Sequence, residues 1–177
     1  MSEFQYYEFL TIDSPLSNKD QLWLRGLSSR ARITTTRFTN TYTWGDFKGD
    51  PVALMERCFD AHVYTSNFGA RHFMLKLPPG ALERRAADAY VGDYGLTVRS
   101  APSGLILTFD IEGDPEDLYD EEDDETGWMA ALLPLRAELI DGDCRSLYLA
   151  WLLNVQSEAV DDDVVEPPVP PGLAKLS

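Results

Sequence analysis

The sequence predicts an α+β fold: a mixed sheet of about five strands, with helices packed on one face and a helical hairpin at the C-terminal end. Three observations lead to this prediction. Stretches rich in aromatic and β-branched residues alternate with amphipathic stretches as far as residue 112. Beyond residue 128, Leu and Ala at helical spacing dominate. The length of 177 residues and the hydrophobic content of 44% suit one globular domain, which we place at residues 1–157.

The first three elements are a strand, a helix and a strand. Residues 4–12 (FQYYEFLTI) carry apolar side chains on both parities, which is typical of a central strand buried on both faces. Ser17 and Asp20 form a start like a capping box for a helix through about Ser28. Residues 31–44 have the strongest strand signal, with aromatic side chains on one parity and Thr or Arg on the other.

The run TYTWGDFKGDP, residues 41–51, connects that strand to a helix. Gly45 and Gly49 allow backbone angles that other residues resist. Asp50 is a suitable N-cap, and Pro51 suits the first helical position, where its missing N–H costs nothing. We therefore expect this run to be a strand-to-helix connection.

The chain between this connection and residue 112 predicts two more helices and three more strands. Apolar residues at 52, 55, 59 and 63 repeat with helical spacing. The run APSG has the length and residue types of a hairpin connection. The expected helices are 52–64 and 78–90, and the expected strands are 71–77, 94–100 and 104–112.

The last part of the chain predicts a helical hairpin and then a tail. Residues 128–143 and 144–156 are helical in pattern, and Pro134 is expected to kink or restart the first helix. Gly142 is a suitable C-terminal cap. Residues 158–177 are acidic and then proline-rich, which predicts an extended linker or tail.

The formal charge of −15 is concentrated in one segment. Residues 110–125 (DIEGDPEDLYDEEDDE) contain eleven acids and no base. Without them, 30 − 11 = 19 acids face 15 bases, a net charge of −4. We expect residues 113–125 to be a mobile acidic insertion, since they lack the apolar content to fold alone. The overall charge disfavours nucleic acid as a partner without excluding a basic patch elsewhere.

The composition also bears on location and on metals. No apolar run is long enough for a membrane span, and the N-terminus lacks the pattern of a signal peptide, so we expect a cytoplasmic protein that does not bind membranes. Cys58, Cys144, His62 and His72 do not have the spacing of a zinc site. Cys58 and His62 are one helical turn apart in the predicted helix, a poor geometry for nucleophilic attack. We predict no cofactor and no metal site.

Two groups of residues are candidates for a site. Asp46, Lys48 and Asp50 contain the D-x-K spacing with which some nucleases hold Mg²⁺ and stabilise an attacked phosphate; a companion acid, Glu8 or Asp13, would be required. The alternative is that the same residues serve only as a helix cap and a turn.

The second group lies on the more polar face of the predicted sheet, where basic side chains can bind a phosphate or carboxylate, or simply be solvated. Its members are Arg37, His72, Lys76 and Arg99.

The acidic run is a third candidate, as a docking segment for a basic protein surface. It lacks the residue pattern of an EF-hand loop, so a designed Ca²⁺ site is not expected. Its simplest role is a solvated surface segment. The residues expected to dock a partner are Asp120, Glu121, Glu122, Asp123, Asp124 and Glu125.

Several segments resemble a family of uncharacterised bacterial proteins. The likeness covers most of the chain, including YYEFLTID, and its most specific part is WGDFKGDP. Members of this family tend to continue past the proline-rich stretch. The resemblance implies a bacterial, cytoplasmic origin and a chain that belongs to something longer, and it implies no activity, cofactor or site residue.

The sequence therefore predicts a non-catalytic protein-interaction module of a bacterial protein or assembly. The absence of the P-loop, G-x-S-x-G, G-x-G-x-x-G and H-E-x-x-H motifs weighs against the commonest enzyme classes. The alternative is a protein linked to nucleic acid or nucleotides, with metal-dependent phosphodiesterase or nuclease chemistry at residues 46–50. The sequence identifies neither the partner nor the oligomeric state.

Overall fold

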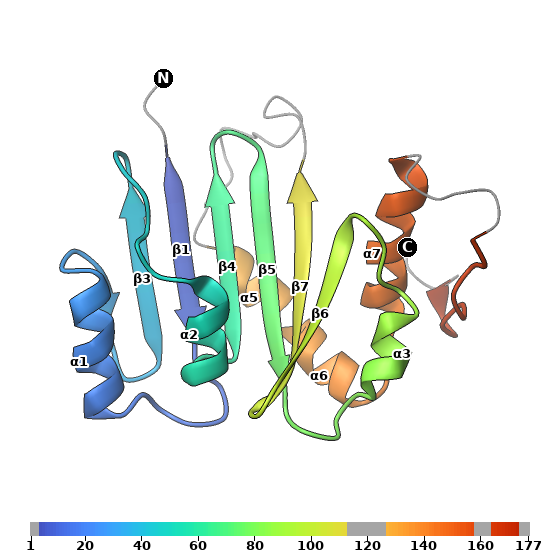
Figure 1. Ribbon diagram of the computed structural model, residues 1–177, viewed down its shortest axis with the longest axis horizontal. Helices are drawn as coiled ribbons and strands as arrows, with labels where there is room; N and C mark the ends of the chain where they lie inside the picture. The colour runs from blue at the N-terminus through green and yellow to red at the C-terminus, as the bar shows by residue number, and fades with distance from the viewer. Residues whose placement is uncertain (1–3, 113–126, 158–163, 174–177) are drawn as a thin grey trace.

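The computed structural model describes residues 4–112, 127–157 and 164–173. A seven-stranded sheet in the order β2-β3-β1-β4-β5-β7-β6 runs through the molecule, and each described pairing is antiparallel (Figure 1). The strands are β1 (Gln5–Leu10), β2 (Arg32–Ile33), β3 (Arg37–Tyr42), β4 (Ala61–Ser66), β5 (Ala70–Leu77), β6 (Gly95–Ala101) and β7 (Gly104–Glu112). The helices are α1 (Asn18–Leu27), α2 (Pro51–Arg57), α3 (Arg84–Asp88), α5 (Trp128–Leu132), α6 (Pro134–Ile140) and α7 (Arg145–Gln156).

The α+β class is confirmed, but the predicted mixed sheet of five strands is wrong in both number and direction. The largest error lies at residues 52–64, where one helix was expected. Helix α2 ends at Arg57, and Ala61–Ser66 form the central strand β4 instead. All six residues of β4 are buried, and a strand buried on both faces cannot be distinguished from a buried helix by its apolar pattern. The short connections from β4 to β5 and from β6 to β7 join antiparallel neighbours, since a parallel pair needs a longer crossover.

Helices cover both faces of the sheet, so the prediction of helices on one face is also wrong. Helices α1 and α2 lie in front of the β3-β1-β4 half in Figure 1, while α5 and α6 lie behind the sheet. The front face carries Phe9 and Phe38, which join a cluster with Leu24 of α1 and Leu54 of α2. The back face carries the second cluster, built from the other half of the sheet together with α3, α5, α6 and α7. The half of the sheet around β1 and β3 thus buries its apolar residues mainly on the front face, and the half around β5, β6 and β7 buries them mainly on the back face.

The C-terminal region contains three consecutive helices where a hairpin of two was expected. Pro134 starts α6 directly after α5, in line with its missing N–H and its fixed φ. Gly142 has φ +84°, the left-handed conformation that ends many helices, and α7 follows. Asn154 then anchors α7 because its side chain accepts a hydrogen bond from Tyr94 N and donates one to Tyr94 O.

The described part of the proline-rich stretch lies against the domain. The Tyr90 hydroxyl donates to Pro168 O at 2.8 Å, Pro170 is buried, and Leu173 packs on the back-face cluster. Residues 164–173 therefore contribute to the packing of the domain.

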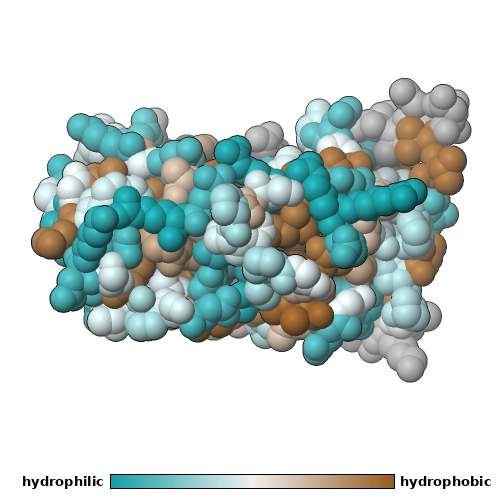
Figure 2. Space-filling view, turned by 60° about the horizontal axis from the view of Figure 1, so that its bottom comes forward, coloured by the Kyte–Doolittle hydropathy of each residue, from teal (hydrophilic) through white to brown (hydrophobic). Residues whose placement is uncertain are grey.

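The exterior is mainly polar at the end of the molecule seen in Figure 2, where hydrophobic residues occur in small, separate groups. Such scattered groups are normal for a protein surface. Within the described ranges, no helix is both long enough and apolar enough to cross a membrane.

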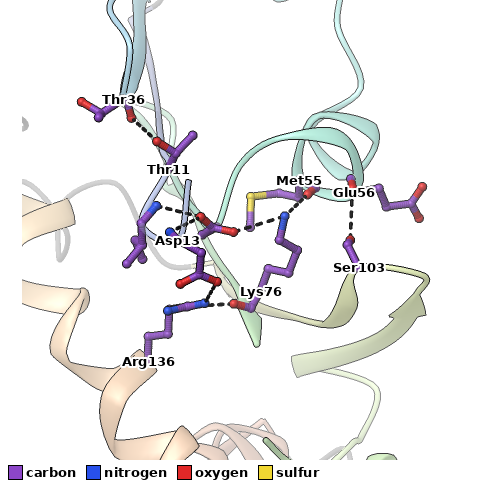
Figure 3. A network of polar contacts seen from close by, with 10 residues as sticks. Thr11, Asp13, Thr36, Met55, Glu56, Lys76, Ser103 and Arg136 are labelled. Carbon is purple, nitrogen blue, oxygen red and sulfur yellow. Dashed lines mark hydrogen bonds and ion pairs between the residues drawn. The ribbon is translucent and has the colours of Figure 1, made fainter. Parts of the chain in front are cut away.

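A buried polar network connects the two layers of helices through the sheet (Figure 3). Lys76 of β5 forms an ion pair with Asp60 at 3.2 Å, and its ammonium group donates to Met55 O in α2. The second oxygen of Asp60 accepts hydrogen bonds from the backbone N–H groups of Ile12 and Asp13.

The back layer joins the same network through Arg136 of α6. Its guanidinium donates to Lys76 O at 2.8 Å and to the Asp13 carboxylate at 2.6 Å (Figure 3). The side chain of Arg136 is buried, so its charge depends on these partners for stabilisation. The network thus fixes the positions of α2 in front of the sheet and of α6 behind it.

Removing the ammonium group of Lys76 should destabilise the fold strongly. Lys76→Met leaves the buried Asp60 carboxylate without its counter-charge, and we expect the free energy of unfolding to fall by about 3 kcal/mol in urea titrations. Lys48→Met is the matched control, because Lys48 is exposed; it should change stability by less than about 0.5 kcal/mol. Equal effects of the two substitutions would show that the ion pair does not stabilise the fold.

Candidate functional site

The loop at residues 45–50 is built around a buried phenylalanine. Phe47 packs against the rings of Tyr7, Phe9 and Phe38, with centroids 5.2 to 6.1 Å away. A Cβ at Gly49 would lie 2.4 Å from the Phe47 ring, so glycine is required there for close packing. The sequence-based prediction did not include Phe47 as the anchor of the loop, although an aromatic residue between two glycines was a usable signal.

The three polar candidates of this loop contact a neighbouring side chain, solvent and the backbone, respectively. Asp46 accepts a hydrogen bond from Gln5 Nε2, Lys48 is exposed, and Asp50 caps α2 by accepting from Val52 N at 2.9 Å. The proposed companion acids are engaged elsewhere, Glu8 with Arg37 and Asp13 with Arg136. Among the described residues no three His, Cys, Asp or Glu side chains are grouped to hold a metal ion.

The four basic candidates do not converge. Arg37 lies on the back face, where it pairs with buried Glu8 at 2.8 Å. Lys76 is buried in the network described above. Arg99 pairs with Glu56 of α2 at 2.7 Å, and His72 is hydrogen-bonded to Asp110 on β7. Each side chain therefore has a local partner, and the four form no common site.

His62 and Cys58 do not lie together on one helix: His62 is buried in β4, and Cys58 is half-buried at the end of α2. The His62 ring stacks on Phe9 with centroids 3.9 Å apart, and its Nδ1–H donates to Glu8 O. Burial lowers the pKa of His62 from 6.5 to about 3 and raises the pKa of Cys58 to about 12. The histidine is therefore neutral and the thiol protonated at neutral pH.

The docking residues 120–125 lie outside the described residues.

A pocket lies on the back face, between the sheet and helices α5, α6 and α7. It has a volume of about 590 Å³. Apolar side chains make up most of its walls: Phe73 and Phe109 from the sheet, Leu132 from α5, Leu135 from α6, and Leu149 and Leu153 from α7.

A few polar groups line this apolar pocket. Thr65 is only 6% exposed, and its hydroxyl has no hydrogen-bond partner within the described structure. The Ser146 hydroxyl is buried and likewise unpaired there. The Arg71 guanidinium lies over the Trp128 ring, 4.8 Å from its centroid. Arg145 is bound by Asp143 at 2.6 Å and lies 3.9 Å from Glu138.

No local motif could have indicated this pocket. Its residues come from four strands and three helices, and residues 63–73 and 145–153 lie far apart in the chain. One signal was present: the residues of α7 are apolar on more than one face, which requires more than one apolar contact surface.

The pocket and the loop have no counterpart from which roles could be transferred. No protein-family model, curated protein or solved structure matches the chain. The function is therefore inferred from the geometry of the molecule itself.

Burial of His62 makes stability depend on pH. The unfolded chain binds a proton below about pH 6.5, whereas folded His62 stays neutral down to about pH 3. The free energy of unfolding should therefore fall as pH drops from 6.5 towards 3, with His62 contributing about 1.4 kcal/mol per pH unit. Urea unfolding at pH 7, 6 and 5 measures this slope.

His62→Gln should reduce the slope, because the titrating group is gone, even if stability at pH 7 also falls. His72→Gln serves as the control, since His72 is half-exposed and should leave most of the slope in place. Equal slopes for the wild-type protein and His62→Gln would contradict the assignment of a neutral buried histidine.

Proposed function

We propose that the chain is a non-catalytic interaction module that works within a larger bacterial protein or assembly, and that its back-face pocket receives an apolar group of the ligand. The pocket is the observation that carries this proposal. Its volume of about 590 Å³ falls in the range of roughly 300–1,000 Å³ found for ligand sites, and its lining is mainly apolar with a few polar groups.

Access from outside supports binding at this site. Leu149 on α7 is 47% exposed, and Ile111 on β7 is 45% exposed, although both line the pocket. Apolar side chains that line a hollow and also reach solvent gain favourable contacts when a ligand covers them.

The candidate catalytic side chains are already engaged in structural contacts, which supports binding rather than catalysis. Asp50 caps a helix, Lys76 holds the buried network, and His62 is buried in the front core. Lys76 and His62 are buried away from any substrate, and the Asp50 carboxylate is engaged in capping α2. The bacterial setting of the proposal comes from the family resemblance and from nothing in the geometry.

A charge placed at the lip of the pocket should abolish binding of an apolar probe. We expect N-phenyl-1-naphthylamine, a neutral dye, to bind the wild-type protein with a rise in fluorescence, and Leu149→Lys to weaken this binding at least about tenfold, because an ammonium group would enter the apolar wall. Both are measured by titration with the dye.

Leu152→Lys is the matched control. Leu152 lies on the same helix and is 36% exposed, but it does not line the pocket, so the dye should bind as it does to the wild-type protein. Absence of dye binding to the wild-type protein, or equal losses in the two variants, would overturn the proposal.

A further inference from the structure

We infer that His62, His72 and Met74 form a copper(I) site in a small hollow on the front face of the sheet. This site is separate from the back-face pocket and independent of the proposed function. It departs from the sequence-based prediction of no metal site, because a thioether was not among the ligands considered there.

The hollow lies beside the start of α2 and has a volume of about 320 Å³. In the register of β4 and β5, His62 is directly opposite Met74, and His72 is one diagonal step away. Opposite side chains on one face have Cβ atoms about 4.5–5.5 Å apart, and diagonal ones up to about 8 Å. The three side chains thus share one small space. The residues that line it are Tyr7, Pro51, His62, Tyr64, His72 and Met74.

His62 has a buried ring nitrogen without a partner. Its ring stacks on Phe9, and Nδ1–H donates to Glu8 O at 2.9 Å, so Nε2 of the neutral ring carries a lone pair. No group of the described structure donates to this Nε2, and the atom is not among the fully enclosed unpaired atoms, so it opens on the hollow. Because the residue is only 1% exposed, the opening admits an ion rather than a substrate.

His72 has the same arrangement of its two nitrogens. Its Nδ1 is hydrogen-bonded to Asp110, and its Nε2 has no partner within the described ranges. Histidines that bind metals almost always donate their other ring N–H to a carboxylate or a backbone carbonyl, which fixes the ring and strengthens it as a ligand. The Asp110 carboxylate and Glu8 O hold the two rings in this way.

Met74 and the lack of free oxygen atoms determine the choice of metal. A thioether selects copper(I), and imidazole also suits copper. The hydroxyls of Tyr7 and Tyr64 both donate to Gln5 Oε1, at 2.9 and 3.2 Å, so neither is free to complete a set of oxygen ligands. Zinc would need a third His, Cys, Asp or Glu, and no such group of three occurs among the described residues.

The charges around the hollow do not oppose a cation. No lysine or arginine lines it. Lys76, the next residue on the same face of β5, is paired with Asp60 at 3.2 Å. The nearest carboxylate, Asp110, holds His72 and adds a negative charge beside the ligands. An ion with one positive charge therefore suits this environment.

Titration with copper(I) alone tests the site. We expect the full chain, under anaerobic conditions, to withdraw one copper(I) ion from its coloured complex with bicinchoninate. Copper(I) is diamagnetic, so NMR can follow the imidazole rings, and the chain has only two histidines. Both ring signals should shift on binding. Absence of binding, or a shift of His72 alone, would overturn the site.

Met74→Leu separates copper(I) from other metals. It should lower the affinity for copper(I) at least about tenfold and leave any affinity for zinc(II) unchanged, because a thioether binds the first ion and not the second. Met55→Leu is the matched control, since Met55 is buried in the same front cluster but does not line the hollow. Its copper(I) affinity should equal that of the wild-type protein. Equal affinities in the wild-type protein and Met74→Leu would contradict the inference.

The two cysteines are tested as well, because thiolates are also soft ligands. The double variant Cys58→Ala, Cys144→Ala should keep both the copper(I) affinity and the shifts of the two histidine rings. Loss of copper(I) binding in this variant would assign the ion to the thiols and rule out the site. None of these measurements involves the dye or the back-face pocket, so the site and the proposed function stand or fall separately.

Discussion

The buried ion pair between Lys76 and Asp60 is the interaction on which the arrangement of the whole domain depends. Taking two charges out of water is costly, and their attraction offsets this cost only when further hydrogen bonds complete the site. Here Met55 O and the N–H groups of Ile12 and Asp13 complete it. Because those groups belong to α2 and to the end of β1, the pair can form only when the front layer is in place. Arg136 extends the same requirement to the back layer.

This constraint explains how two layers of helices that cover different halves of the sheet keep a fixed position relative to each other. The front cluster and the back cluster lie on opposite faces and over different halves of the sheet, so apolar packing alone ties each layer only to its own half. The network sits where the two halves meet, at β4 and β5. Its directional bonds supply a specificity that non-directional apolar contacts lack.

The distribution of satisfied and unsatisfied polar groups separates structural from functional candidates. Of the residues that the sequence marked as chemical, Lys76, Asp50 and Arg99 have partners that explain them as elements of the fold. Thr65, which the sequence did not mark, keeps a buried hydroxyl without a partner inside an apolar pocket. Departures from complete pairing tend to occur at functional sites, which makes this threonine more informative than the charged residues.

What the sequence determined by itself was local. The cap at Asp50, the proline starts at Pro51 and Pro134 and the end of α6 at Gly142 follow from backbone chemistry at single residues. Tertiary structure decided the rest. Residues 61–66 became the strand β4 because pairing with β1 and β5 outweighed their helical pattern, and burial on both faces erased the alternation that would have revealed it. The pocket, too, exists only after distant segments meet, because its shape depends on how three helices lie across a sheet and not on the preference of any one of them.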